Sequence, residues 1–241
     1  MREWFVDFQQ DLWLRGKSHI DSAEEAKFIH KALRLRKGQR VLDAPCGEAR
    51  IAVHLARAGV DVTGVDITKA FLARARRLFH REKLKGVFYH KDLRDIEFDG
   101  EFDAVFNWFG SFGYFPDKEN ADVVMRFAKA LKPGGKLLID QVNRERVLRN
   151  FKTRQAGERL TVKARWNSKS QRVESEWTFT QKNGRRISSR SSIRMYTIGQ
   201  FRMLFEKAGL VLEKTYGTTV GGPYSRKSAR MIVVGRKPRS R

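Results

Sequence analysis

Short β-type runs alternate with amphipathic helical stretches along the first 140 residues of the chain. This alternation is typical of an α/β fold, in which helices cover a mostly parallel sheet. Apolar residues recur near helical spacing in the longer stretches, so these are predicted to be helices. The pattern predicts strands over residues 40–43, 60–66, 86–92, 102–107 and 136–140, and helices over 48–58 and 118–131 with two more after Ser22 and Thr68.

Residues that favour helix ends and turns separate these predicted elements. Ser22 and Glu25 have the spacing of a capping box, and Thr68 is a suitable N-cap. Gly59 is a typical helix stop, and the Lys-Pro-Gly-Gly sequence over 132–135 predicts a turn into the fifth strand. Local signals and hydrophobic pattern therefore predict the same element boundaries.

The last 100 residues follow a different pattern. Thr197 and Gln200 have the spacing of a capping box at the start of an amphipathic helix, and two further strands are predicted over 210–216 and 231–234. Between residues 144 and 196, polar and apolar residues alternate as in strands that are buried on one face. This insertion is predicted to be a small antiparallel sheet with strands over 160–166, 173–179 and 187–196 and a hairpin turn at Asn183-Gly184.

The 241 residues are enough for one sizeable core, and their 41% hydrophobic content argues against wholesale disorder. The single cysteine excludes an intramolecular disulfide, and no apolar run approaches the roughly 18 residues of a membrane span. No hydrophobic signal-peptide segment follows Met1, so we expect a cytoplasmic protein.

Positive charge is concentrated at one end of the chain. The net charge is +23, but residues 141–241 carry 25 basic and only 6 acidic side chains, a net of +19. A basic excess that is confined to one segment suggests a surface that meets an anionic partner. The alternative, solvated Lys and Arg that keep the protein soluble, has about equal weight.

Two acidic residues end the first two predicted strands. Asp43 follows Arg-Val-Leu, and Asp66 lies 23 residues later. An acidic residue at about this distance is suited to a ribose diol, because a carboxylate accepts hydrogen bonds from both hydroxyls. Pro45 and Ala49 replace glycines that would approach a pyrophosphate. The loop that follows Asp43 therefore favours a nucleoside ligand without phosphates.

At five successive places the chain resembles the class I S-adenosylmethionine-dependent methyltransferases. The motifs are Asp-Ala-Pro-Cys-Gly over 43–47, Gly-Val-Asp over 64–66, Lys-Asp-Leu over 91–93, Phe-Asp-Ala-Val over 102–105 and Leu-Lys-Pro-Gly-Gly over 131–135. Their order and spacing match over about 100 residues. The first motif resembles that of a subgroup with Pro-Cys-Gly, although glycine is usual at positions 45 and 49. The resemblance implies a seven-stranded, mostly parallel sheet with helices on both faces, closed by an antiparallel pair of strands.

The resemblance also implies a division of the chain and a site for S-adenosylmethionine. We expect one domain over 1–241, with a cofactor-binding core over 1–143, a β insertion over 144–196 that covers the cofactor pocket, and a closing part over 197–241. Asp43 and the backbone of Ala44, Pro45, Cys46 and Gly47 would hold the amino-acid end of the cofactor. The remaining cofactor contacts would come from Asp66 to the ribose, Ile67, Asp92 and Leu93 to the adenine, and Asn107 near the sulfonium.

Cys46 is expected to be a small packed residue beneath the cofactor, because methylation at carbon 5 of cytosine needs a thiolate elsewhere. The five histidines have no metal-ligand spacing, so we predict no metal site. A catalytic residue cannot be assigned, and His19, Tyr114 and Tyr196 are the candidates for a general base.

Two classes of methyl acceptor remain open. We favour a nitrogen or oxygen atom of a small molecule, which can be neutral or acidic. The candidate substrate residues are Trp108, Tyr114, Arg194 and Tyr196. The alternative is RNA, because the insertion mixes Trp166, Trp177 and Phe179 with many arginines. Equally, these aromatic residues could form the buried face of the insertion and the arginines its solvated face. A fold that only binds a partner is the third and least favoured class. The segment after the fourth strand lacks the Pro-Pro-aromatic signature of the enzymes that methylate the amino group of adenine, which disfavours adenine as the acceptor.

Overall fold

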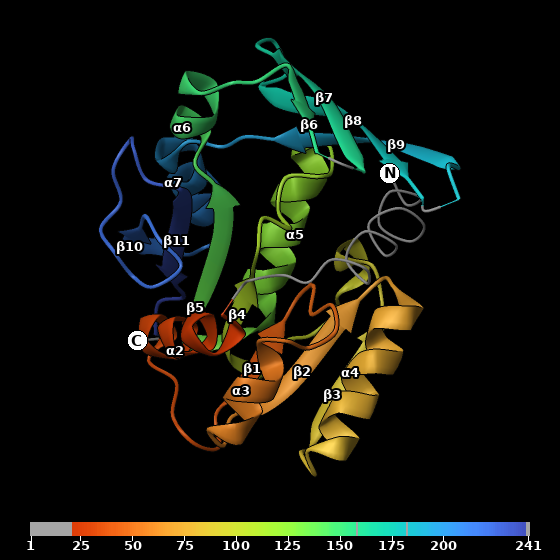
Figure 1. Ribbon diagram of the computed structural model, residues 1–241. Coiled ribbons are helices and arrows are strands. Elements are labelled where there is room, and N and C mark those ends of the chain that lie inside the picture. Colours follow the sequence, from red (N-terminus) through yellow and green to blue (C-terminus); the bar gives the residue numbers. More distant parts are fainter. Residues whose placement is uncertain (1–20, 158, 182, 240–241) are drawn as a thin grey trace.

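The computed structural model describes residues 21–157, 159–181 and 183–239. A seven-stranded sheet lies at its centre, with the strand order β10-β11-β5-β4-β1-β2-β3 (Figure 1). Its middle strands are parallel, whereas β11 is antiparallel to both β5 and β10. The strands are β1 (Arg40–Asp43), β2 (Asp61–Asp66), β3 (Gly86–His90), β4 (Phe102–Asn107), β5 (Leu131–Val142), β10 (Val211–Tyr216) and β11 (Arg230–Arg236).

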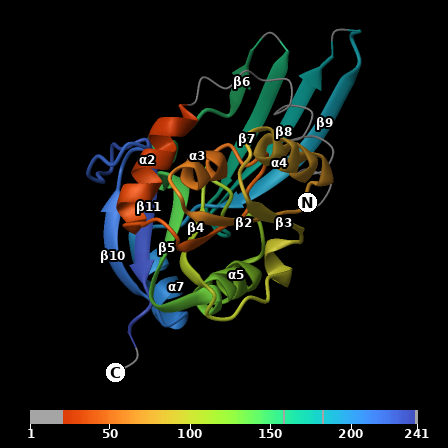
Figure 2. The ribbon, with the colours of Figure 1, turned by 90° about the horizontal axis from the view of Figure 1, so that it is seen from below.

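Helices cover both faces of this sheet, as Figure 2 shows. On one face lie α2 (Ser22–Leu33), α3 (Ala52–Arg57) and α4 (Lys69–Arg81), and their apolar residues form one core cluster with the sheet. On the other face α5 (Asp117–Ala130) and α7 (Ile198–Lys207) form a second cluster. The two-layered core confirms the predicted doubly covered sheet.

A separate four-stranded antiparallel sheet follows the carboxyl end of β5 and lies at the top of Figure 1. It is preceded by the short helix α6 (Arg144–Arg149) and has the order β6-β7-β8-β9. Its strands are β6 (Arg154–Ala156), β7 (Leu160–Asn167), β8 (Arg172–Thr180) and β9 (Arg186–Arg194). The predicted insertion is therefore present, with one strand and one helix more than its sequence pattern indicates.

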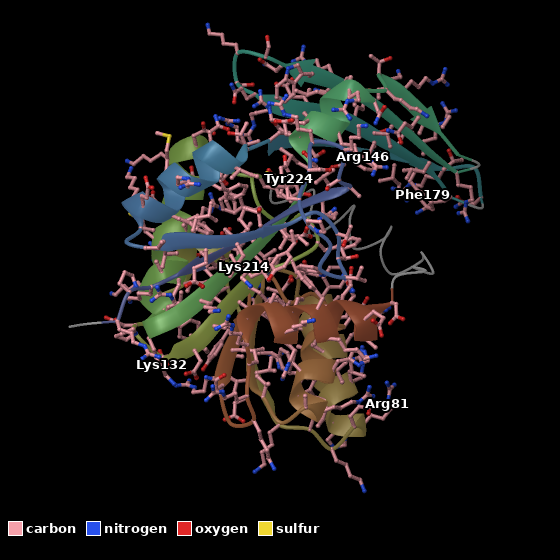
Figure 3. The ribbon with its side chains drawn as sticks, turned by 90° about the vertical axis from the view of Figure 1, so that its left-hand side faces the viewer. Arg81, Lys132, Arg146, Phe179, Lys214 and Tyr224 are labelled. Atoms are coloured by element: carbon pink, nitrogen blue, oxygen red, sulfur yellow. The ribbon has the colours of Figure 1, made fainter. Side chains whose placement is uncertain are left out.

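The side chains of the small sheet divide cleanly between its two faces. The register pairs Val162 with Trp177 and Phe179 with Ile187 on one face, which carries no charged residue over β7, β8 and β9. The opposite face pairs Arg165 with Glu174 and Glu176 with Arg190. Figure 3 shows Phe179 on the side that faces the rest of the molecule. The aromatic residues and the exposed arginines thus lie on opposite faces.

Several predicted boundaries differ from the structure. Asp21 rather than Ser22 is the N-cap of α2, because its Oδ1 accepts the backbone N–H groups of Ala23 and Glu24 at 3.0 and 3.1 Å. The helix predicted over 48–58 is shorter, since the chain only becomes α-helical at Ala52. The turn predicted over 132–135 falls inside β5 (Leu131–Val142), at the irregularity between the pairs Phe102–Leu131 and Ala104–Lys136, where Gly134 has a left-handed φ of 82°.

Candidate functional site

A cavity of about 890 Å³ opens at the carboxyl ends of β1, β2 and β4. The loops after β1, β2, β3 and β4 and one side of α4 line it. Ligands of open α/β sheets bind at this edge of the sheet, because consecutive strands diverge there to helices on opposite faces. Ten of the fourteen predicted site residues lie on the wall of the cavity: Asp43, Pro45, Cys46, Gly47, Asp66, Ile67, Asp92, Leu93, Trp108 and Tyr114.

The loop after β1 is folded tightly against β2. Gly47 and Ala49 both have left-handed backbones, with φ of 52° and 63°, which explains why glycine would be usual at position 49. The backbone N–H of Gly47 donates to Asp66 Oδ2 at 2.8 Å. A Cβ on Gly64 would lie only 2.8 Å from the sulfur of Cys46, so this glycine allows the loop to pack on the strand.

Cys46 is buried in that contact. Burial raises the pKa of its thiol well above the ordinary value, and the nearby carboxylates of Asp43 and Asp66 raise it further. A thiol in this environment stays protonated and is a poor nucleophile. The structure thus gives Cys46 a packing role.

Asp43 presents a buried carboxylate to the cavity. It has no hydrogen-bond partner among the described residues and is only 3% exposed. Burial raises its pKa well above the ordinary value, the positive charge of Arg50 opposes this, and Asp66 adds to it. A buried carboxylate without a donor is costly unless a ligand supplies one.

Arg50 reaches the cavity from the same side and is held by α2. Its Nη1 donates to Glu25 and, at 3.2 Å, to the hydroxyl of Ser22. The indole N–H of Trp108 donates to the same carboxylate oxygen of Glu25 at 3.1 Å. The other terminal nitrogen of Arg50, Nη2, is buried and has no hydrogen-bond partner among the described residues. Nη2 of Arg50, a positively charged donor, and the carboxylate of Asp43, a negatively charged acceptor, therefore lie on one wall of the cavity. Neither has a hydrogen-bond partner among the described residues.

The carboxylates of Asp66 and Asp92 lie further along the wall of the cavity. Asp66 is 5% exposed and its Oδ1 accepts the N–H of Thr68 at 2.7 Å. Burial raises the pKa of Asp66, while the hydrogen bonds from Thr68 and Gly47 oppose this shift. Asp92 accepts the guanidinium of Arg94 at 2.8 and 3.0 Å. A carboxylate offers about four lone-pair directions, so the bonds from Gly47 and Thr68 leave Asp66 with acceptor capacity toward the cavity.

The segment from Trp108 to Pro116 forms the opposite wall. Phe109 has a left-handed backbone with φ of 63°, and its ring lies between the guanidinium groups of Arg50 and Arg230 at 4.9 and 5.9 Å. Arg230 forms two hydrogen bonds with the buried carboxylate of Asp140. Two ion pairs with buried carboxylates thereby fix the loop that follows β4.

The remaining four predicted site residues do not line the cavity. Asn107 and Ala44 lie behind the wall, where Asn107 Nδ2 donates to the carbonyl of Ala44 at 2.8 Å. Arg194 is 7% exposed, since its Nε donates to Asp117 and its Nη1 to the carbonyl of Met195. Tyr196 packs between Phe112 and Phe201.

Arg172 connects the insertion to the cavity wall. Its guanidinium donates to the carbonyls of Gly113, Tyr114 and Phe115 at 3.1 to 3.2 Å, and Tyr114 packs against Phe179. No described residue of the insertion itself lines the cavity. The insertion instead contacts the loop after β4, which lines the cavity.

Sequence reasoning missed Arg50, Glu25 and the cavity face of α4. The spacing of Arg74, Arg77 and Arg81 indicates one face of a helix but gives no sign that this face borders a cavity. The partnership of Glu25 with Arg50 depends on the packing of α2 against the loop after β1. No local pattern encodes it.

A general base is not evident in the cavity. Its described lining contains no histidine, and His19 lies outside the described residues. Burial raises the pKa of Tyr196 to about 12, which makes it a weak candidate, whereas Tyr114 is at the wall. Among the described residues no cluster of His, Cys, Asp or Glu could hold a metal ion, and no helix has the length and apolarity needed to span a membrane.

Comparison with known proteins agrees with this geometry. Residues 41–135 match the family model described as a methyltransferase domain. The ubiquinone biosynthesis O-methyltransferase of Coxiella burnetii is 29% identical over 152 residues, which are 61% of this chain and 62% of that protein. The chain thus spans less than two thirds of this curated relative.

Two solved structures resemble the whole chain. The CcbJ methyltransferase from Streptomyces caelestis has a TM-score of 0.85 at 18% identity and covers 99% of both chains, which shows a shared fold. The sugar N-methyltransferase KedS8 from Streptoalloteichus has a TM-score of 0.71 at 26% identity and covers 96% of this chain and 93% of its own. The fold and the match over residues 41–135 together support a class I methyltransferase.

Proposed function

We propose that this protein transfers a methyl group from S-adenosylmethionine to a nitrogen or oxygen atom of a small acceptor. One observation carries the proposal. A single cavity at the carboxyl edge of the sheet joins a buried unpartnered carboxylate, a buried unpartnered guanidinium nitrogen and a second buried carboxylate, on Asp43, Arg50 and Asp66. These are the groups that an amino acid linked to a nucleoside requires.

The amino-acid end of the cofactor fits the wall formed by Asp43 and Arg50. Its ammonium group would supply the donor that Asp43 lacks, and its carboxylate would accept from Nη2 of Arg50. Both are charge-assisted hydrogen bonds in a buried place, where such bonds are strongest. This assignment adds Arg50 to the residues that the family resemblance implies.

The nucleoside end fits the wall that runs from Asp66 to Leu93. Asp66 would accept the two ribose hydroxyls, and the apolar side chains of Ile67 and Leu93 would flank the adenine. Asp92 would accept a hydrogen bond from the adenine amino group. The absence of a glycine-rich phosphate loop agrees with a ligand that has no phosphate.

Bound S-adenosylmethionine supplies a sulfonium, which is already an activated methyl donor. The protein then has to hold the acceptor atom about 3–3.5 Å from the methyl carbon and in line with the bond that breaks. Trp108, Ser111 and Tyr114 line the part of the cavity nearest the end of β4. These side chains can orient an acceptor without a covalent intermediate.

The chemistry of the lining favours nitrogen as the acceptor atom. A neutral amine can attack before it loses its proton, whereas a hydroxyl generally needs a base to remove the proton first. The described lining has no histidine, and the carboxylates of Glu48, Asp92 and Glu119 are held in ion pairs with arginines. KedS8, which resembles this chain over nearly its whole length, is named a sugar N-methyltransferase.

An acidic acceptor is compatible with the cavity through Arg77. This side chain lines the wall and has no ion-pair partner among the described residues. Arg194 and Tyr196, which the sequence suggested for this role, are used in the core instead. Arg77 is thus the better candidate for binding an acid group of the substrate.

RNA is not favoured as the acceptor. Base stacking and phosphate binding by one surface require aromatic and basic side chains on the same face. In the small sheet these two kinds of side chain lie on opposite faces, and Arg165 and Arg190 are paired with Glu174 and Glu176. The basic composition of the insertion therefore fits a solvated outer face.

Methyl transfer can be tested with the tritiated cofactor and total cell extract, with and without prior RNase treatment. We expect label in the small-molecule fraction, unaffected by RNase, and no transfer by Asp66→Ala. Label confined to RNA would contradict the acceptor class. Failure of the wild type to bind S-adenosylhomocysteine in calorimetry would remove the whole proposal.

A further inference from the structure

A second cavity lies at the C-terminal end of α2, whereas the first cavity meets this helix at its N-terminal end. It has a volume of about 340 Å³ and shares no lining residue with the cofactor cavity. The last turn of α2 forms one side of it, and β5, β10 and β11 form the other. Figure 3 labels Lys214, which contributes to this cavity from β10.

The charges around this second cavity are strongly unbalanced. Four cationic side chains line it, from Lys31, Arg34, Lys136 and Lys214, and the only carboxylate in its described lining is that of Glu213. Three of these cations, those of Lys31, Arg34 and Lys214, have no ion-pair partner among the described residues. Like charges that share a small cavity repel one another unless an anion joins them.

The carboxylate of Glu213 already interacts with two cationic side chains. Glu213 accepts a hydrogen bond from Nε of Arg236 at 2.5 Å, and its other oxygen lies 3.6 Å from Nζ of Lys136. The side chain of Lys136 is only 15% exposed, so water compensates its charge poorly. The lining therefore keeps a net charge of about +3 after Glu213 is counted.

A β-bulge places two neighbouring charged residues at this cavity. The pairing of β10 with β11 shifts between Leu212 and Lys214, which leaves Glu213 as the extra residue. In a regular strand, adjacent side chains point to opposite faces, but here both Glu213 and Lys214 line the same cavity. Bulges often serve to redirect a side chain in this way.

The dipole of α2 acts in the opposite direction but is smaller. The helix C-terminus contributes about half a negative charge near Lys31 and Arg34. The carbonyls of His30 and Lys31 there already accept N–H groups of the cap. This partial charge offsets about one sixth of the excess.

We propose that the second cavity binds the phosphate group of a small molecule. A phosphate carries up to two negative charges and several acceptor oxygens, which suits three lysines and one arginine around a space of this size. Bound phosphate would join the end of α2 to β5 and β10 through Lys31, Lys136 and Lys214. The binding site is independent of methyl transfer and does not rest on the proposed function.

Calorimetry with inorganic pyrophosphate tests this site directly. The titration is done at about 0.15 M salt in the presence of saturating S-adenosylhomocysteine, so that the cofactor cavity is filled. We expect saturable binding of one pyrophosphate per chain. The double variant Lys31→Ala/Lys214→Ala should raise the Kd at least tenfold, which corresponds to about 1.4 kcal/mol.

The matched control is Lys37→Ala/Lys207→Ala. It removes the same charge from two exposed lysines that lie outside the cavity and have no ion-pair partner among the described residues. Its Kd should stay within about twofold of the wild type. An equal loss in both double variants would show diffuse attraction only, and either that result or absence of saturable binding would overturn the proposal.

Amide hydrogen exchange gives a second readout. Pyrophosphate should slow exchange in the last turn of α2 in the wild type and leave it unchanged in Lys31→Ala/Lys214→Ala. Slower exchange in both proteins would place the anion elsewhere and contradict the proposed site.

Discussion

At the scale of single residues, the proposed cofactor site depends on Asp43 and Arg50. The carboxylate of Asp43 and Nη2 of Arg50 are buried and have no hydrogen-bond partner among the described residues, although most buried polar atoms in proteins are hydrogen-bonded. Leaving both unpaired destabilises the free protein. In the proposed function, a zwitterionic ligand that bonds to both groups would offset this cost.

Arg50→Ala should weaken binding of S-adenosylhomocysteine by about 10- to 100-fold, because it removes one charge-assisted hydrogen bond worth roughly 1.5–3 kcal/mol. Binding of 5′-methylthioadenosine, which lacks the amino-acid group, should change by less than about threefold. Calorimetry with the two ligands separates these effects. Equal losses for both would show that Arg50 supports the loop after β1 and does not contact the amino-acid group.

Asp43→Asn should stabilise the protein in the absence of cofactor. Because the pKa of Asp43 is raised in the folded state, the free energy of unfolding of the wild type falls as pH rises from the ordinary value near 3.8 through the raised value. The side chain of the Asp43→Asn variant does not ionise, so the variant does not lose this stability as the pH rises. Its melting temperature at pH 7 should therefore be a few degrees higher than that of the wild type. Its affinity for S-adenosylhomocysteine should fall about tenfold or more. A lower melting temperature at pH 7 would contradict this account.

At the scale of residues, the sequence predicted the acidic members of the site better than the basic one. Asp43 and Asp66 end strands and belong to spaced motifs, so their positions follow from the alternation of elements. Arg50 depends on Glu25, which lies 25 residues away on α2. The residue types of Arg194 and Tyr196 suggest a substrate role, but the structure uses Arg194 in an ion pair with Asp117 and Tyr196 in aromatic packing.

At the scale of elements, the insertion acts on the cavity through Arg172. Five hydrogen bonds leave its guanidinium, three to carbonyls of the loop at 113–115 and two to Ser192 of β9. Tyr114 and Phe115 of that loop line the cavity. The small sheet therefore positions a part of the cavity wall that belongs to the loop after β4.

Arg172→Ala should raise the KM for the acceptor and lower kcat, while the Kd for S-adenosylhomocysteine stays within about twofold. Loss of several buried hydrogen bonds is expected to lower kcat/KM by at least about tenfold. Arg165→Ala is the matched control, because Arg165 is exposed and pairs with Glu174 on the outer face of the same sheet. An equal effect of the two substitutions would show that the sheet itself had been disturbed.

The order of elements was largely predictable from the sequence, but their edges were not. The predicted capping box of Thr197 and Gln200 is confirmed, with both of its hydrogen bonds present. It could be predicted because its geometry depends on only four consecutive residues. The strand β6 is only Arg154–Ala156, too short to show alternation, and it exists because β7 offers it a partner. Similarly, β5 already begins at Leu131, which pairs with Phe102, and the regular pairing with β4 and β11 starts only at Lys136, so residues 132–135 form an irregularity inside the strand.

At the scale of the whole molecule, the excess positive charge is spread over surfaces that do not line the cofactor cavity. None of the basic residues after position 140 lies on its described wall. Exposed cations gather on the outer face of the small sheet, and some are tied to Glu174 and Glu176. Such a surface attracts polyanions without reading their sequence.

The fourfold variant Arg165→Ala/Arg185→Ala/Arg186→Ala/Arg190→Ala tests whether that attraction has any part in catalysis. These side chains are exposed and on or beside the face opposite Trp177 and Phe179, so their removal leaves the contact with Tyr114 intact. We expect retention of RNA on a filter to fall steeply, with a shallower dependence on salt, because fewer phosphates are neutralised. Turnover of a small acceptor should stay within about twofold, since no cavity residue changes. A parallel loss of turnover and RNA retention would instead mean that the acceptor is bound by this outer face, and the small-molecule proposal would fail.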